Sequence, residues 1–67
     1  MYFITMDEGG KQSYVATKDD VEAGGFVDAT PEDFGFSSRE EAENTMAELQ
    51  AYADEKGYDL SFFIEEA

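Results

Sequence analysis

The sequence predicts an α+β fold in which a β-hairpin, a long loop, one α-helix and one β-strand follow each other along the chain. Three observations predict it. Two runs rich in aromatic and β-branched residues flank a pair of glycines, a capped amphipathic segment covers residues 37–57, and the last ten residues alternate between apolar and polar. Because 67 residues supply only one hydrophobic core, we expect a single compact domain over residues 1–67.

The hairpin is predicted from residues 2–6, YFITM, and residues 13–17, SYVAT. The glycine pair 9–10 at its tip suits a two-residue turn, which needs positive φ angles. This turn fixes the register through two opposed pairs, Glu8 with Lys11 and Ile4 with Val15. Since side chains alternate along a strand, one face carries Tyr2, Ile4, Met6 and Val15, and the other carries Phe3, Tyr14 and Ala16.

Residues 18–36 hold three glycines, the only proline and six acids. This composition predicts an ordered loop with at most one helical turn, near residues 19–23, and with room for a short edge strand at 25–28. Five apolar side chains are available to attach the loop to the rest of the domain: Val21, Phe26, Val27, Phe34 and Phe36.

Residues 37–57, SSREEAENTMAELQAYADEKG, predict an α-helix with clear ends. A capping box is available at its start as Ser38 with Glu41 or Ser37 with Glu40, and Gly57 suits a left-handed stop. At about 100° per residue, one arc of the helix carries Ala42, Thr45, Met46, Leu49, Tyr52 and Ala53. The opposite arc carries all six acids of the segment: Glu40, Glu41, Glu43, Glu48, Asp54 and Glu55.

The last segment, YDLSFFIEEA, alternates as a half-buried strand does. A right-handed crossover places it beside the first strand, which gives a three-stranded antiparallel sheet of order 2-1-3 with the helix packed on one face. The predicted core joins Ile4, Met6, Val15, Leu60, Phe62 and Ile64 of the sheet to Ala42, Met46, Leu49 and Ala53 of the helix.

Three aromatic side chains, Phe3, Tyr14 and Phe63, fall on the sheet face away from the helix. Either the 18–36 loop covers them with its own phenylalanines, or they form a dimer or partner interface. We favour the loop, because free monomers rarely expose an aromatic patch.

The composition argues against several kinds of site. The chain has no cysteine and no histidine, which removes disulfides, thiolate metal sites and the commonest general base. A sheet with one helix offers little cleft for a catalytic pair of carboxylates, so we expect no enzyme and no cofactor. The acids of the 18–36 loop suggest a divalent-ion site, but their spacing differs from that of an EF-hand loop. The glycine pairs 9–10 and 24–25 do not lead into a helix with a lysine, as a phosphate-binding loop does.

The apolar runs are too short for a signal peptide or a membrane span, which predicts a cytoplasmic protein with no membrane contact. Seventeen acidic against four basic residues give a net charge of −13. An ordinary solvated helix face mixes both signs, whereas here the only bases, Arg39 and Lys56, lie at the helix ends. Asp54 and Glu55 also oppose the helix dipole. Such a surface repels nucleic acid and attracts a cationic groove that is built to hold it.

In size, acidity and lack of catalytic residues, the chain resembles the small DNA-mimic inhibitors of bacteriophages, including anti-CRISPR proteins. The resemblance rests on composition and on the charge pattern of residues 19–66 and includes no motif. It implies a non-enzymatic inhibitor that competes with DNA for a cationic nucleic-acid-binding protein, such as a CRISPR effector in the host cytoplasm. We expect a monomer rather than a homodimer. The charge pattern gives the expected partner-binding residues: Glu40, Glu41, Glu43, Glu48, Asp54, Glu55, Asp19, Asp20, Glu22, Glu32 and Asp33.

Two other interpretations stay open. A halophilic protein is also rich in acids and poor in lysine, and a phage structural or adaptor module needs no DNA-like role. Salt separates the first of them, because a halophilic protein needs molar salt to fold. A DNA mimic folds in dilute buffer and loses its binding as salt rises.

Overall fold

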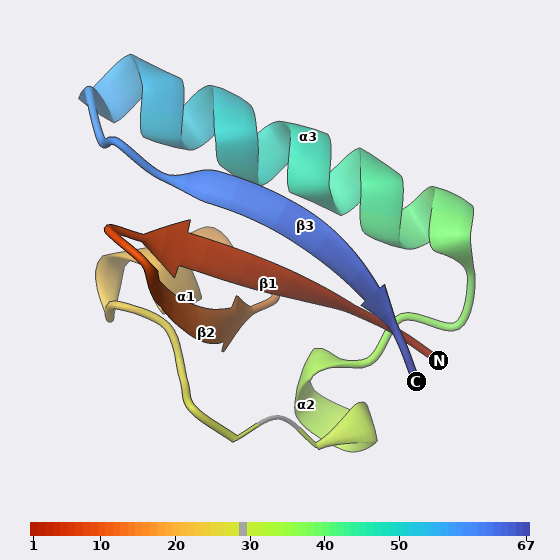
Figure 1. Cartoon of the computed structure of the whole chain (residues 1–67). Coiled ribbons are helices and arrows are strands. Elements are labelled where there is room, and N and C mark those ends of the chain that lie inside the picture. The colour runs from red at the N-terminus through yellow and green to blue at the C-terminus, as the bar shows by residue number, and fades with distance from the viewer. Residues whose placement is uncertain (29) are drawn as a thin grey trace.

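A three-stranded antiparallel sheet in the order β2-β1-β3 forms the centre of the computed structural model, which describes residues 1–28 and 30–67 (Figure 1). Its strands are β1 (Tyr2–Glu8), β2 (Lys11–Val15) and β3 (Ser61–Glu66). Helix α3 (Arg39–Lys56) crosses one face of the sheet. The predicted α+β fold, strand order and helix position are therefore confirmed.

The hairpin has the predicted register, with Ile4 opposite Val15 and Glu8 opposite Lys11. The two turn glycines both have positive φ, 60° at Gly9 and 92° at Gly10, which is what a tight hairpin turn requires. The second strand ends at Val15, two residues before the predicted end. The reason is local, because Thr17 is the N-cap of a short helix, and a capping residue leaves the strand ladder.

Two short helices, α1 (Lys18–Glu22) and α2 (Pro31–Phe34), interrupt the predicted 18–36 loop. The first occupies the expected place, but the second shows that the expected limit of one helical turn was wrong. Thr30 caps α2 by accepting a hydrogen bond from the Asp33 N–H at 3.3 Å, and Pro31 supplies a first helical residue with a suitable φ. Ala29, within the predicted loop, lies outside the described residues.

The loop joins the sheet at two single bridges. Phe26 pairs with Tyr14 through backbone hydrogen bonds of 2.7 and 3.0 Å, and this bridge stands where a short edge strand had been expected. Phe36 pairs with Tyr2 in the same way, at 2.8 and 3.0 Å. The chain therefore returns to the start of β1 immediately before it enters α3.

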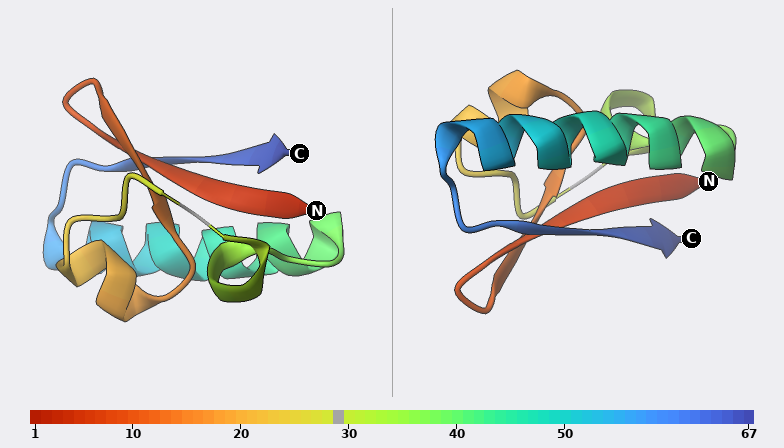
Figure 2. Two further views of the ribbon diagram at one scale, coloured as in Figure 1. Left: turned by 90° about the horizontal axis from the view of Figure 1, so that it is seen from below. Right: turned by 90° about the horizontal axis from the view of Figure 1, so that it is seen from above.

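The core lies between the sheet and the helices α1 and α3. Helix α1 lies beside α3 and adds Val21 to this core (Figure 2). Ile64, a predicted core residue, is only half-buried, on the edge strand β3. The remaining buried residues of the cluster match the prediction and are Ile4, Met6, Val15, Leu49, Ala53, Leu60 and Phe62.

Helix α2 lies on the opposite side of the sheet from α3 (Figure 1). Its Pro31 lines a shallow pocket of about 290 Å³ together with Phe3 and Tyr14, and only 7% of Phe3 is exposed. The loop therefore reaches these two rings through Pro31, whereas Phe36, one of the phenylalanines expected to cover them, packs against the core instead. Phe63 is 52% exposed and stays uncovered. No helix in the described part of the chain is both long and apolar enough to cross a membrane.

Candidate functional site

Helix α3 holds six carboxylates on a rigid support. Its first turn is capped by Ser38, whose Oγ accepts a hydrogen bond from the Glu41 N–H at 3.1 Å, and it ends at Gly57, which has a left-handed φ of 76°. Its 18 residues span about 27 Å. Because the buried stripe of the helix faces the sheet, all six predicted acids of this helix are exposed: Glu40, Glu41, Glu43, Glu48, Asp54 and Glu55.

Few basic side chains accompany these acids. Within residues 1–28 and 30–67, the one ion pair joins Arg39 Nε to Glu43 Oε1 at 3.6 Å, and both side chains are about half exposed. An exposed pair of this kind adds little stability. Lys18 and Lys56 instead place their Nζ atoms 5.6 and 5.7 Å from the centre of the Tyr52 ring, within the range of cation–π contacts. The outer face of α3 is therefore strongly anionic.

The acids of the 18–36 loop divide between the two sides of the molecule. Asp19 belongs to α1 and shares a groove of about 420 Å³ with Glu48 of α3, so these two predicted residues belong to one surface. Glu32 and Asp33 belong to α2, on the far side of the sheet (Figure 1). The structure therefore brings Asp19 together with Glu48 of α3, in a groove that Lys18 also lines, and separates both from the α2 acids.

Two of the predicted binding residues have structural roles. Asp20 Oδ2 accepts hydrogen bonds from the Ala16 and Thr17 N–H groups at 2.8 and 3.0 Å, and it completes a capping box with Thr17. Asp33 Oδ2 accepts a hydrogen bond from the Thr30 hydroxyl at 3.1 Å. The spacing Thr-x-x-Asp, present at both places in the sequence, is a helix-start signal that accounts for these two acids without a partner.

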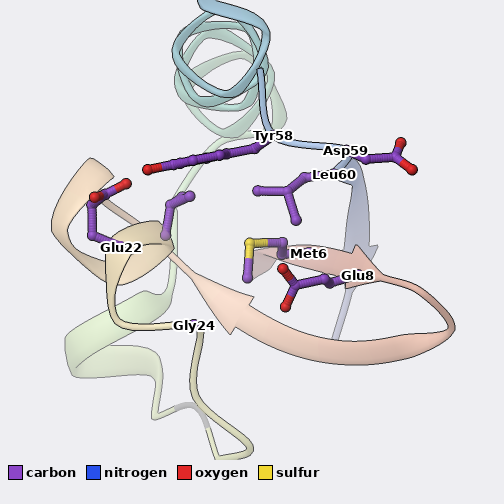
Figure 3. Close-up of a pocket in the computed structure, with 8 residues that line it drawn as sticks. Met6, Glu8, Glu22, Gly24, Tyr58, Asp59 and Leu60 are labelled. Atoms are coloured by element: carbon purple, nitrogen blue, oxygen red, sulfur yellow. The ribbon is translucent and has the colours of Figure 1, made fainter. Parts of the chain in front are cut away.

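A pocket of about 330 Å³ opens near the end of α3, between the hairpin, α1 and the segment that leads into β3 (Figure 3). Its apolar lining comes from Met6, Val21 and Leu60. Three carboxylates, a tyrosine and a glycine complete the lining: Glu8, Glu22, Asp59, Tyr58 and Gly24. Of the acids, only Glu22 was predicted, because Glu8 and Asp59 lie far apart in the sequence and neither has a local signal.

The Glu22 carboxylate is directed toward the Tyr58 hydroxyl (Figure 3). Hydrogen bonding to Glu22, followed by partial burial, raises the pKa of Tyr58 above the ordinary value of 10.0. Partial burial, followed by the hydrogen bond and negative charge of Glu22, raises the pKa of Tyr52 in the same direction. Both tyrosines therefore favour the protonated form beside Glu22, where α1, α3 and the segment before β3 meet.

The arrangement of acids has no evident metal geometry. In the described ranges 1–28 and 30–67, no three or more acidic side chains form a group that could hold a metal ion. Comparison of the chain with protein-family models, with curated proteins and with solved structures gives no match.

Proposed function

We propose that this protein is a non-enzymatic inhibitor whose acidic surface occupies a cationic nucleic-acid-binding site of a partner protein, such as a CRISPR effector. The observation that carries the proposal is the exposed face of α3. It presents six carboxylates, of which Glu43 alone forms an ion pair among the described residues. Asp19 of α1 extends this face across the groove that it shares with Glu48. In this proposal the protein acts as a monomer in the cytoplasm.

The spacing of the α3 acids supports the comparison with DNA. From Glu40 to Glu55 the helix rises about 22 Å, at about 1.5 Å per residue, so the six charges are about 4.5 Å apart along the axis on average. One strand of a DNA duplex carries about one charge per 3.4 Å of axis. Carboxylates at this spacing on a rigid helix are able to pair with basic side chains of the partner that would otherwise contact the phosphates of one DNA strand.

The charge of the whole protein supports the same kind of partner. A net charge of −13 steers the molecule toward cationic grooves and away from nucleic acid and other anions. Because most of this charge is exposed, the attraction depends on ionic strength, with a screening length of about 8 Å at physiological salt. The proposed complex therefore forms fastest in dilute buffer.

A competition experiment tests the proposal. A labelled DNA duplex is bound to each member of a panel of CRISPR effector complexes, and the protein is added at increasing concentration. We expect the parent protein to displace DNA from at least one effector. The variant Glu43→Gln, Glu48→Gln, Asp54→Asn and Glu55→Gln should displace it at least about tenfold less well, since surface charges set the electrostatic attraction between the partners.

The matched control changes four acids that lie outside α3: Asp28→Asn, Glu32→Gln, Glu65→Gln and Glu66→Gln. It has the same net charge as the α3 variant and should compete like the parent. Equal loss in both variants would mean that total charge, rather than the α3 surface, is responsible. Failure of the parent to displace DNA from any effector at low salt would contradict the proposal. Unfolding of the parent in dilute buffer would favour a halophilic protein instead.

A further inference from the structure

We propose that the pocket in Figure 3 receives an arginine side chain of the partner. The inference rests on the proposed function only for the origin of the arginine, since the partner is a cationic protein. The pocket has three parts that match this side chain: an apolar base, an aromatic wall and the carboxylates of Glu8 and Glu22 at its rim, whereas the Asp59 carboxylate points away (Figure 3).

The apolar base suits the stem of an arginine. Met6, Val21 and Leu60 form the bottom of the pocket, where exposures of 1%, 5% and 8% leave a narrow strip of apolar surface open to a ligand. Long basic side chains cover apolar surface with their methylene groups and keep the charged group at the edge. The volume of about 330 Å³ lies in the range of small-ligand pockets and leaves room for one such side chain.

The wall and the rim suit the guanidinium group. Tyr58 lines one side of the pocket, and its hydroxyl is directed toward Glu22 (Figure 3). A guanidinium group stacks on aromatic rings and forms paired hydrogen bonds with carboxylates, whereas a lysine ammonium is a single point of charge. Glu8 and Glu22 reach the pocket from different elements, β1 and α1, and neither forms an ion pair within the described residues.

The experiment uses the full chain labelled with ¹⁵N and observed by NMR. The probes are acetyl-arginine amide, acetyl-lysine amide and acetyl-citrulline amide, of which citrulline has nearly the shape of arginine but no charge. We expect saturable shifts from the arginine probe at Glu8, Glu22 and residues 58–60. The lysine probe should bind several-fold more weakly, and the citrulline probe should produce no saturable shift.

Variants connect the shifts to the pocket. Glu22→Gln should weaken binding of the arginine probe at least about threefold, and Glu8→Gln, at an exposed strand end, gives a second test if the first variant fails to fold. Glu32→Gln, on the far side of the sheet, changes the charge equally and should leave binding unchanged.

Several results would overturn the inference: shifts spread evenly over the α3 acids, equal binding of the arginine and citrulline probes, equal binding of lysine, or equal loss in Glu32→Gln. The two proposals fail separately. If the arginine probe binds but the protein does not compete with DNA, the inhibitor function fails and the arginine pocket stands. If the protein competes with DNA but the probe causes no shifts in the pocket, the arginine pocket fails and the inhibitor function stands.

Discussion

The two ends of α3 carry acids in opposite electrostatic surroundings. At the start of the helix, Glu40 and Glu41 lie in the first turn, where the helix dipole favours negative charge. At its end, Asp54 and Glu55 lie in the last turn, where the dipole disfavours it. The adjacent base, Lys56, is placed over the Tyr52 ring. The helix dipole therefore stabilises the acids at the start of α3 and does not stabilise those at its end.

This difference helps to separate structural acids from acids that are available for binding. Asp54 accepts a hydrogen bond from the Gln50 side chain at 3.3 Å, an exposed contact that offers little compensation. The end of α3 is also where the hairpin tip, α1 and the lead into β3 approach each other (Figure 1). Acids that oppose the dipole thus lie at the same end of the molecule as the proposed arginine pocket.

The largest expected effect concerns the core that both ends share. Leu49 lies in the middle of α3 and is 2% exposed, and Phe62 lies across from the helix on β3. Leu49→Ala or Phe62→Ala should reduce the free energy of unfolding by about 2–5 kcal/mol through cavity formation, as measured by urea denaturation. Glu48→Ala, an exposed neighbour, is the control. If hydrogen exchange showed a loss of amide protection at only one end of α3, the two ends would fold independently and would not share this core.

A smaller effect is expected at the C-terminal stop. Gly57 has a φ of 76°, and a Cβ at this position would meet nothing within 4 Å. Gly57→Ala therefore changes only backbone strain and should reduce the free energy of unfolding by about 1–2 kcal/mol. Gly57→Asn should be tolerated better, because asparagine adopts the left-handed conformation more readily. Equal stability of the alanine variant and the parent would mean that the helix end rearranges without loss.

The helix dipole of α3 predicts effects of opposite sign at its two ends. Asp54→Asn with Glu55→Gln removes two charges from the unfavourable end, and Glu40→Gln with Glu41→Gln removes two from the favourable end. Each charge contributes about 0.3–1 kcal/mol. Both double variants change the net charge equally, and Asp54→Asn keeps an acceptor oxygen for the Gln50 side chain, so the difference between their free energies of unfolding reports mainly on the dipole. If the two variants were equally stable, the comparison of the ends would lose its basis.

Features that depend on neighbouring residues were predictable from the sequence, and those that depend on the folded chain were not. The hairpin register and the limits of α3 depend on neighbouring residues, such as the turn glycines and Ser38, and both were predicted. Helix α2 was missed although Thr30 and Pro31 mark its start, because the proline and glycines of that stretch were attributed to a loop. The pocket was not predictable, since Glu8, Glu22 and Asp59 come together only after the chain has folded.

The smallest expected effect is a loss of stability in alkali that originates at the C-terminal end of α3. The neighbouring Glu22 carboxylate and partial burial raise the pKa values of Tyr52 and Tyr58 in the folded protein above their ordinary value of 10.0. As pH rises, the unfolded chain therefore releases these two protons first. Linkage then requires the stabilisation to be complete below about pH 10 and to disappear as pH passes through the raised values.

Both rings keep part of their surface in water, so the effect on stability should be modest. The measurement combines urea denaturation at several pH values between about 9 and 11 with the ultraviolet absorbance of tyrosinate. Glu22→Gln is the informative variant, because its amide keeps an acceptor oxygen and loses the negative charge. It should move both titrations toward the ordinary value and flatten the alkaline decline. If the parent and Glu22→Gln lost stability in parallel, the decline would come from elsewhere in the molecule, and Glu22 would not anchor α1 to this end of α3.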